Sequence, residues 1–176
     1  MVLAGATSGR QLLANLISQE SESSESEVLN LDFDKIEVAT ASYLREGIIT
    51  FRDYCRSHRS NLYPVLTNMS EPVIEEIAYL LRAIGDAMVV CVLDNAGEPA
   101  AVQLLGHLDE KQRQTLDAVV ELGQADASTL ASRYQDKEKV GPTAWNNRLA
   151  ALASKGLVIE RQRGRAKFYR PVMEGM

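Results

Sequence analysis

In the C-terminal part of the chain, three helix start signals follow one another at short intervals. Asp109 can cap a first helix, with Gln112 at the reciprocal position of a capping box, and Asp126 can cap a second, shorter helix. The pair Gly141-Pro142 predicts the start of a third helix, because the N–H that proline lacks is one that the first helical turn leaves unbonded. This succession constrains the fold more than any other feature of the sequence.

A basic hairpin is predicted directly after the third helix. That helix is expected to end at Lys155-Gly156, and LVIER and AKFYRPV then have the composition of two strands joined across Arg163-Gly164-Arg165. The charged side chains of the hairpin are Arg161, Arg163, Arg165, Lys167 and Arg170, with only Glu160 among them. Because lysine and arginine near phosphates release counterions, this ribbon is a candidate contact for a nucleic-acid backbone. A solvated basic hairpin is the alternative.

The third helix is expected to have one apolar and one uncharged polar face. At about 100° per residue its large apolar side chains, Trp145, Leu149 and Leu152, cluster on one side. The opposite side carries small or hydrogen-bonding residues: Thr143, Asn147, Ala150 and Ser154. Small residues admit a helix to the major groove, and asparagine can form two hydrogen bonds with adenine. An ordinary amphipathic helix with a polar outer face is the alternative.

Residues 108–173 resemble the winged helix-turn-helix domains of bacterial and archaeal transcription regulators. The stretch GPTAWNNRLAALASKGLVIERQRGRAKFYRPV has the order of that family: recognition helix, Lys-Gly stop, first wing strand, Arg-Gly-Arg tip and second wing strand. The resemblance implies that double-stranded DNA is bound through groove and backbone contacts from Thr143, Asn146, Asn147 and Arg148. It also implies that Arg161, Arg163, Arg165 and Lys167 contact phosphates. Asn146 lies at the flank of the helix, and Arg148, toward the core side, is expected to reach a phosphate.

The preceding hundred or so residues alternate between helix and strand patterns, which predicts an α/β domain with helices covering a small mixed sheet. The first expected elements are a short helix opened by Ser8 and Gln11 as a capping box and a strand VLNLDF (28–33). A helix with the apolar stripe Leu44, Ile48, Phe51 and Cys55 and a strand from Leu62 to Leu66 follow. Next come a helix that is capped by Ser70, carries Val73, Ile77, Leu80 and Ile84 and stops at Gly85, and a hairpin of MVVCVL (88–93) and AVQLL. Pro64 favours an edge or strand-start position, because proline cannot donate to a strand ladder.

This front part resembles the STAS-like domains of anti-sigma-factor antagonists and related regulatory proteins. The resemblance lies in VLNLDFDKIEVATASYLREGI, where a strand ending in Asp-Phe leads through a loop into a helix with serine at its start. In the antagonists that turn holds a phosphorylatable serine in an Asp-Ser-Ser-Gly pattern. Here it reads Thr40-Ala41-Ser42-Tyr43, without the aspartate and the glycine. We therefore expect Ser42 or a neighbour to cap the helix, with phosphorylation of Ser42 at the helix N-terminus as the alternative.

Charge is distributed unevenly along the chain. The net charge is −5, which argues against a protein that is basic overall. The segment SQESESSESE (18–27) is acidic and serine-rich, whereas the last forty or so residues concentrate lysine and arginine. The acidic segment is expected to be a solvated loop. This polarity points to an anionic partner for the C-terminal part alone.

Several other classes of protein are disfavoured by the residues. No apolar stretch is long enough for a membrane span, and the N-terminus lacks the basic region of a signal peptide. Cys55 and Cys91 fall in apolar segments and are expected in the core, with a disulfide as the alternative. His58 and His107 have no clustered partners for a metal site. Without a phosphate loop, a nucleophile–base pair or a convincing carboxylate pair, we expect no enzyme and no cofactor.

The sequence thus predicts an α+β protein of two domains, a STAS-like α/β domain at 1–106 and a winged helix-turn-helix at 107–176. We expect a cytoplasmic transcription regulator with no membrane contact, forming a homodimer on DNA, whose front domain senses a small-molecule effector or binds a regulatory protein. The alternative is a protein-interaction module in which a STAS-like switch binds another regulator and the winged helix serves as a docking platform. A role in a phage-defence or mobile-element system stays open, because such systems also use winged-helix proteins.

Overall fold

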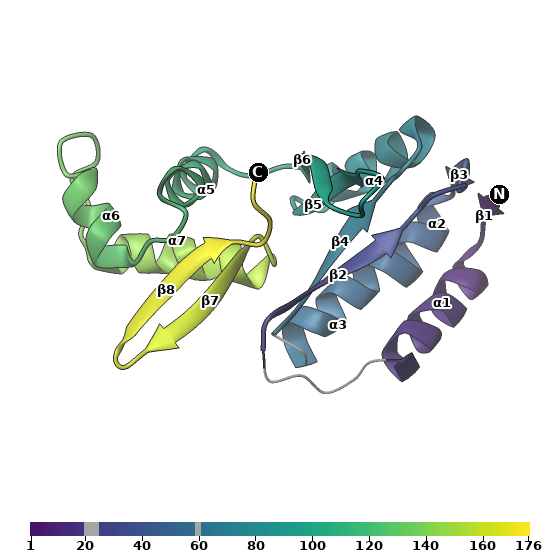
Figure 1. Ribbon diagram of the computed structural model, residues 1–176, viewed down its shortest axis with the longest axis horizontal. Coiled ribbons are helices and arrows are strands. Elements are labelled where there is room, and N and C mark those ends of the chain that lie inside the picture. The colour runs from purple at the N-terminus through teal and green to yellow at the C-terminus, as the bar shows by residue number, and fades with distance from the viewer. Residues whose placement is uncertain (20–24, 59–60) are drawn as a thin grey trace. The chain divides into compact units, whose positions relative to one another are not determined.

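The computed structural model describes residues 1–19, 25–58 and 61–176, so that part of the acidic segment 18–27 lies outside the described residues (Figure 1). The chain divides into two compact units, Met1–His107 and Leu108–Met176, where the sequence predicts a boundary at Gly106. Helices and strands are both well represented, which confirms the α+β class.

The first unit is built on a four-stranded mixed sheet. Its strands are β2 (Glu27–Asp32), β4 (Leu62–Thr67), β5 (Ala87–Leu93) and β6 (Pro99–Gly106), hydrogen-bonded in the order β2-β4-β5-β6. β2, β4 and β5 run parallel, and β6 returns antiparallel to β5. The predicted strands at 28–33, 62–66 and 88–93 and the predicted hairpin are confirmed.

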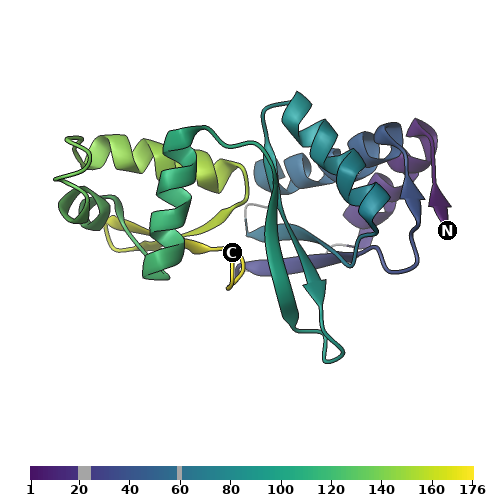
Figure 2. The same ribbon diagram turned by 90° about the horizontal axis from the view of Figure 1, so that it is seen from above.

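Helices lie on one side of this sheet (Figure 2). They are α1 (Ala6–Gln19), a long helix made of α2 (Ala41–Tyr43), the π-helical segment η1 (Leu44–Ile49) and α3 (Thr50–His58), and α4 (Glu71–Ala83). The predicted stripe of Leu44, Ile48, Phe51 and Cys55 is fully buried, as expected. The strand residues in the same core are Leu31, Leu66, Met88, Val90 and Leu105, which the strand register places on one face. The unit is therefore a two-layer α/β structure.

The expectation that Pro64 marks an edge or a strand start is wrong, because β4 is an interior strand with β2 on one side and β5 on the other. The register explains how proline is tolerated there. β4 pairs with β2 along its whole length, but its register with β5 joins only Leu66 to Val90 and Thr67 to Cys91. Pro64 thus lies in the part of β4 outside its ladder with β5.

Two helix-end predictions also need correction. α1 begins at Ala6, so Ser8 lies inside its first turn and forms no capping box with Gln11. Gly5 precedes the helix, and its carbonyl oxygen accepts the Gly9 N–H at 3.1 Å as the first hydrogen bond of the helical ladder. At the other end of the unit, α4 stops at Ala83, so Ile84 leaves the apolar stripe and is 55% exposed. Gly85 follows with a positive φ of 66°, as expected of a helix stop.

α1 packs on the π-helical segment through backbone contacts at two glycines. A Cβ atom added to Gly9 would lie 2.7 Å from the Tyr43 carbonyl oxygen, and one added to Gly47 would lie 3.1 Å from the Gly9 carbonyl oxygen. Ahead of α1, β1 (Val2–Leu3) pairs in parallel with β3 (Val38–Ala39), two strands too short to leave a pattern in the sequence. The N-terminal segment is therefore fastened to the start of the long helix.

The second unit consists of three helices followed by an antiparallel hairpin (Figure 1). The elements are α5 (Glu110–Leu122), α6 (Ala127–Arg133), α7 (Pro142–Ser154), β7 (Val158–Arg163) and β8 (Ala166–Pro171). The capping box of Asp109 and Gln112 is present with both hydrogen bonds, and Asp126 caps α6 by accepting the Thr129 N–H at 2.7 Å. These element and cap predictions are confirmed.

The hairpin gains a short third partner that the sequence did not predict. Ala125 and Tyr169 exchange two backbone hydrogen bonds, of 2.9 and 2.8 Å, in an antiparallel bridge. Ala125 lies between the end of α5 and the start of α6. The bridge thus joins the connection between α5 and α6 to strand β8 of the hairpin.

Candidate nucleic-acid interface

α7 is held in the second unit by one apolar face. Gly141 precedes the helix in extended geometry and Pro142 occupies its first turn, as the sequence predicts. Trp145, Leu149 and Leu152 are buried, with exposed fractions of 2%, 0% and 0%. Lys155 ends the helix, and Gly156 follows with φ 75°. The buried stripe fixes which side of α7 faces outward.

The outward face of α7 is uncharged and accessible. Thr143, Asn146, Asn147, Ala150 and Ser154 are all exposed. The Ser154 hydroxyl donates to the Ala151 carbonyl oxygen at 2.8 Å, so it is already engaged within the helix. The amide groups of Asn146 and Asn147 are the strongest hydrogen-bonding groups on this face, and they can both donate and accept.

Arg148 is engaged within the unit. Its guanidinium lies 2.6 Å from Glu138 Oε2 and stacks over the Trp145 ring, with Cζ 4.8 Å from the ring centroid. The Arg148 side chain is only 12% exposed. Of the four predicted contacts on α7, three therefore lie free on the outside, and Arg148 would have to exchange Glu138 for a phosphate. Sequence reasoning placed Arg148 toward the core side but did not find its partner.

The tip of the β7–β8 hairpin is basic and exposed. Arg161, Arg163, Arg165 and Lys167 are exposed, and strand alternation puts Arg161 and Arg163 on the same face. Within the described residues, no carboxylate lies within ion-pair distance of Arg161, Arg163 or Arg165. Arg163 contributes a guanidinium 5.6 Å from the centroid of the Phe168 ring. Three arginines without an ion pair in the described chain thus lie near the tip of the hairpin, Arg161 and Arg163 on β7 and Arg165 in the turn.

Glu160 neutralises the opposite face of the hairpin. Its carboxylate lies 2.8 Å from Lys167 Nζ and accepts a hydrogen bond of 3.1 Å from the Tyr169 hydroxyl. Burial, together with the charge of Glu160 and this hydrogen bond, raises the pKa of Tyr169 to about 12. The hairpin therefore has one face of free arginines and one face where Lys167 is paired.

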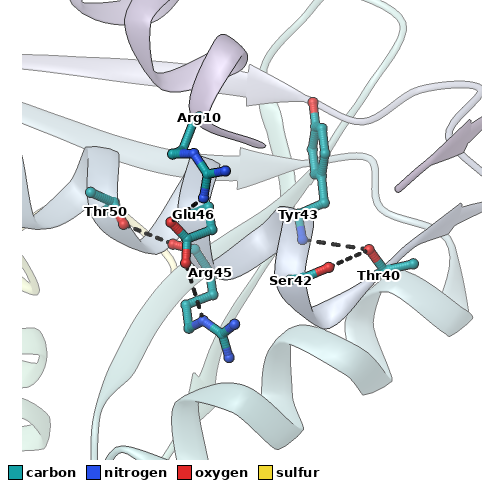
Figure 3. Close-up of polar contacts among 7 residues, drawn as sticks. All are labelled: Arg10, Thr40, Ser42, Tyr43, Arg45, Glu46 and Thr50. Atoms are coloured by element: carbon teal, nitrogen blue, oxygen red, sulfur yellow. Dashed lines mark hydrogen bonds and ion pairs between the residues drawn. The ribbon is translucent and has the colours of Figure 1, made fainter. Parts of the chain in front are cut away.

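In the turn before the long helix of the first unit, Thr40 is the N-cap residue (Figure 3). Its hydroxyl oxygen accepts the Tyr43 N–H at 3.4 Å and lies 3.2 Å from the half-buried Ser42 hydroxyl. The expectation that Ser42 or a neighbour caps this helix is confirmed for the neighbour Thr40. Phosphorylation of Ser42 stays a prediction.

The π-helical segment beside this turn was not predicted. Arg45 supplies a carbonyl oxygen that accepts both the backbone N–H and the hydroxyl group of Thr50, the latter at 2.9 Å (Figure 3). Glu46 lies 3.5 Å from Arg10 of α1 and 3.6 Å from Arg45. A π-helical turn contains one extra residue, and this changes the spacing of the apolar residues too little to be recognised in the sequence.

A scan against models of protein families matches no family to this chain, and a search of curated proteins gives no match either. Within residues 1–19, 25–58 and 61–176, no helix is long and apolar enough to cross a bilayer. In the same ranges no group of three or more His, Cys, Asp or Glu side chains is arranged to hold a metal ion.

Proposed function

We propose that the second unit is a winged helix-turn-helix that binds double-stranded DNA, and that the protein is a non-enzymatic, cytoplasmic transcription regulator. α7 is the recognition helix, with Thr143, Asn146 and Asn147 toward the major groove. The β7–β8 hairpin is the wing, with Arg161, Arg163 and Arg165 on the phosphate backbone. Arg148 and Lys167 are backbone contacts that first leave their carboxylate partners.

The observation that carries this proposal is the set of three exposed arginines around Gly164 without carboxylate partners in the described chain. Like charges crowded on one turn repel one another and do not help the hairpin to fold. Phosphates relieve this repulsion and release counterions, which supplies favourable binding free energy. The uncharged outward face of α7 supports the same proposal, because a carboxylate there would repel the backbone on either side of the groove.

In this proposal the first unit is the STAS-like regulatory domain, and the regulator acts as a homodimer. The domain receives a small-molecule effector or a partner protein, and Ser42 is its candidate phosphorylation site. The second candidate function is a protein-interaction module that uses the winged helix for docking. It is favoured by Arg148 and Lys167, since both already have carboxylate partners at 2.6 and 2.8 Å and need no phosphate.

The test is a fluorescence-anisotropy titration of the full chain against random-sequence duplex DNA at about 50 and about 200 mM salt. The double variant Arg163→Ala with Arg165→Ala should weaken binding to all sequences. It should also make the slope of log affinity against log salt less steep, by about 1.8 in magnitude, since each phosphate contact contributes about −0.9.

The matched control is Lys111→Ala with Arg113→Ala, which removes the same charge from the exposed side of α5. It should leave the slope nearly unchanged. An equal loss in both double variants would mean that the unit attracts DNA only by its overall charge and would remove the wing assignment. Absence of binding at the lower salt concentration would contradict DNA binding and favour the docking function.

A further inference from the structure

The second unit contains a cavity on the side of α7 that faces inward. Its volume is about 380 Å³, and it lies between α5, the segment that follows α6, and α7. The lining side chains that matter here are Asp117 and Glu121 from α5, Tyr134, Lys137 and Glu138 from the connecting segment, and Trp145 from α7. A volume of this size accommodates a small metabolite.

Two of the three carboxylates at the cavity are already neutralised. Glu121 lies 2.8 Å from Arg133 and accepts a hydrogen bond of 3.1 Å from the Tyr134 hydroxyl. The Arg133 hydrogen bond, followed by that from Tyr134, lowers the pKa of Glu121, so this carboxylate stays ionised and paired. Glu138 is paired with Arg148 at 2.6 Å. Neither group has an uncompensated charge to offer a ligand.

One acid and one base then remain at the cavity. Asp117 has no ion-pair partner in the part of the chain that the structure describes. Lys137 likewise has no carboxylate within ion-pair distance there, and its ammonium lies 5.9 Å from the centroid of the Tyr134 ring. The cavity thus presents one negative and one positive group outside any ion pair of the described chain, with the Lys137 charge also acting on Glu121 at longer range. Together Asp117 and Lys137 complement a ligand carrying one charge of each sign.

Trp145 lies in the wall of the cavity with its polar atom closed to solvent. Its ring is 2% exposed, and its indole Nε1 is buried without a hydrogen-bond partner in the described residues. Leaving a buried donor unbonded costs about 1–3 kcal/mol. This N–H has no exposed surface, so it takes no part in the contacts that a ligand in the cavity makes. The Trp145 and Tyr134 rings, 5.7 Å apart, provide apolar wall for the rest of the molecule.

We propose that this cavity binds a small zwitterion of the amino-acid type. Its carboxylate is received by Lys137 Nζ and its ammonium group by the Asp117 carboxylate. The aliphatic body lies against Tyr134. The site depends only on contacts within the second unit and does not require that this unit binds DNA.

The experiment uses the intrinsic fluorescence of Trp145, which is the only tryptophan of the chain. The full-length protein is titrated with each of the non-aromatic protein L-amino acids and with 4-aminobutyrate as zwitterions. Butylamine and butyrate serve as single-charge controls. The aromatic amino acids, which absorb in the same range, are titrated by calorimetry. At least one zwitterion should give a saturable signal, and both single-charge compounds should bind at least about tenfold more weakly, since a charged hydrogen bond is lost in each case.

Two variants test the assigned groups, and one serves as the control. Asp117→Asn and Lys137→Gln should each weaken zwitterion binding by about tenfold or more. Asp136→Asn removes a charge beside Lys137 but outside the cavity lining, and it should leave binding unchanged. No saturable signal with any zwitterion would overturn the proposal. So would butylamine or butyrate binding as tightly as the zwitterions, or equal losses in Asp117→Asn and Asp136→Asn.

Discussion

The β5–β6 and β7–β8 hairpins have similar turn backbones, but their turns carry side chains of opposite charge. Both are antiparallel, and both have a glycine with positive φ in the turn, Gly97 at 82° and Gly164 at 61°. In the first, the Asp94 carboxylate accepts the backbone N–H groups of Ala96 and Glu98, at 2.8 and 2.9 Å. In the second, Arg163 and Arg165 flank the glycine, and a Gln162 amide donates to the Gly164 carbonyl oxygen at 3.1 Å.

The difference separates residues that build a turn from residues that serve another purpose. Asp94 satisfies turn amides directly, so its charge is explained by folding. Arg163 and Arg165 form no ion pair in the described chain, and their like charges repel each other, although the Arg163 guanidinium packs over the Phe168 ring. A charge pattern that no carboxylate of the described chain compensates favours an anionic partner, and this is why these arginines, and not the hairpin geometry as such, support the proposed function.

The largest expected effect concerns the glycine that ends the first hairpin. Gly106 has φ 99°, and a Cβ there would lie 2.1 Å from the Asp86 carbonyl oxygen. Gly106→Ala should lower the free energy of unfolding of the first unit by about 3 kcal/mol or more, because strain and overlap add. Gly164→Ala has open space around it and should cost only about 1 kcal/mol, from its positive φ alone.

Urea denaturation checks this contrast. Circular dichroism follows both units, while Trp145 fluorescence follows the second one, which contains the only tryptophan. Gly106→Ala should shift the transition that is silent in fluorescence, and Gly164→Ala should shift the fluorescent one slightly. Equal shifts for the two variants would mean that the backbone at Gly106 can relax.

An intermediate effect is expected at the Asp94 turn. Asp94→Ala removes the acceptor of two backbone N–H groups and should lower the free energy of unfolding by about 1–2 kcal/mol. Asp94→Asn keeps a side-chain oxygen and should cost less. Both variants should leave DNA affinity unchanged in the anisotropy assay. A marked gain in DNA binding on removal of this charge would show that the first hairpin also lies near the DNA.

The smallest effect is expected from Glu160, the one carboxylate of the second hairpin. Glu160→Gln should strengthen binding to random DNA by roughly two- to threefold, since it leaves Lys167 free to contact a phosphate. It should also bring the pKa of Tyr169 below about 12, although burial, the larger cause, keeps it above the ordinary value of 10.0. Because the pKa is raised in the folded state, the linked stabilisation is present below pH 10.0 and is lost as the pH rises toward about 12.

NMR titration of the Tyr169 ring carbons measures this pKa in both proteins. If Glu160→Gln leaves it at about 12, burial alone explains the shift and the carboxylate has little influence on the hairpin.

Local signals in the sequence predicted the elements well wherever one residue type has one geometric use. The capping box at Asp109, the proline start of α7 and the glycine after α4 are of this kind. The same reasoning failed at Ser8, because α1 already begins at Ala6, after Gly5, whose N–H is held by Thr40 from a distant part of the chain. It also failed for Pro64, since a sequence does not reveal how far two strands overlap.

The candidate interface was predictable only in its exposed part. Periodicity identifies the outward face of α7 and alternation identifies the arginines of the wing. The partners Glu138 and Glu160 were not found, because ion pairs across a connection or a hairpin depend on side-chain reach. The cavity had no signal either: Asp117, Lys137 and Trp145 are separated along the chain and resemble two surface charges and a core residue.

The backbone contact between Gly9 and Gly47 has a mechanical consequence. The two backbones approach closely there, with the Leu12 side chain and the Glu46 Cβ beside the glycines, so a side chain at either glycine would push the two helical segments apart. The N-terminal strand is fastened to the same place, since the Gly5 N–H donates to Thr40 Oγ1 at 3.2 Å and the Thr40 N–H to the Leu3 carbonyl oxygen at 2.9 Å. The N-terminal strand and the turn that holds Ser42 therefore share Thr40 as a common hydrogen-bonding residue, so we expect a displacement of the N-terminus to change the cap of the long helix.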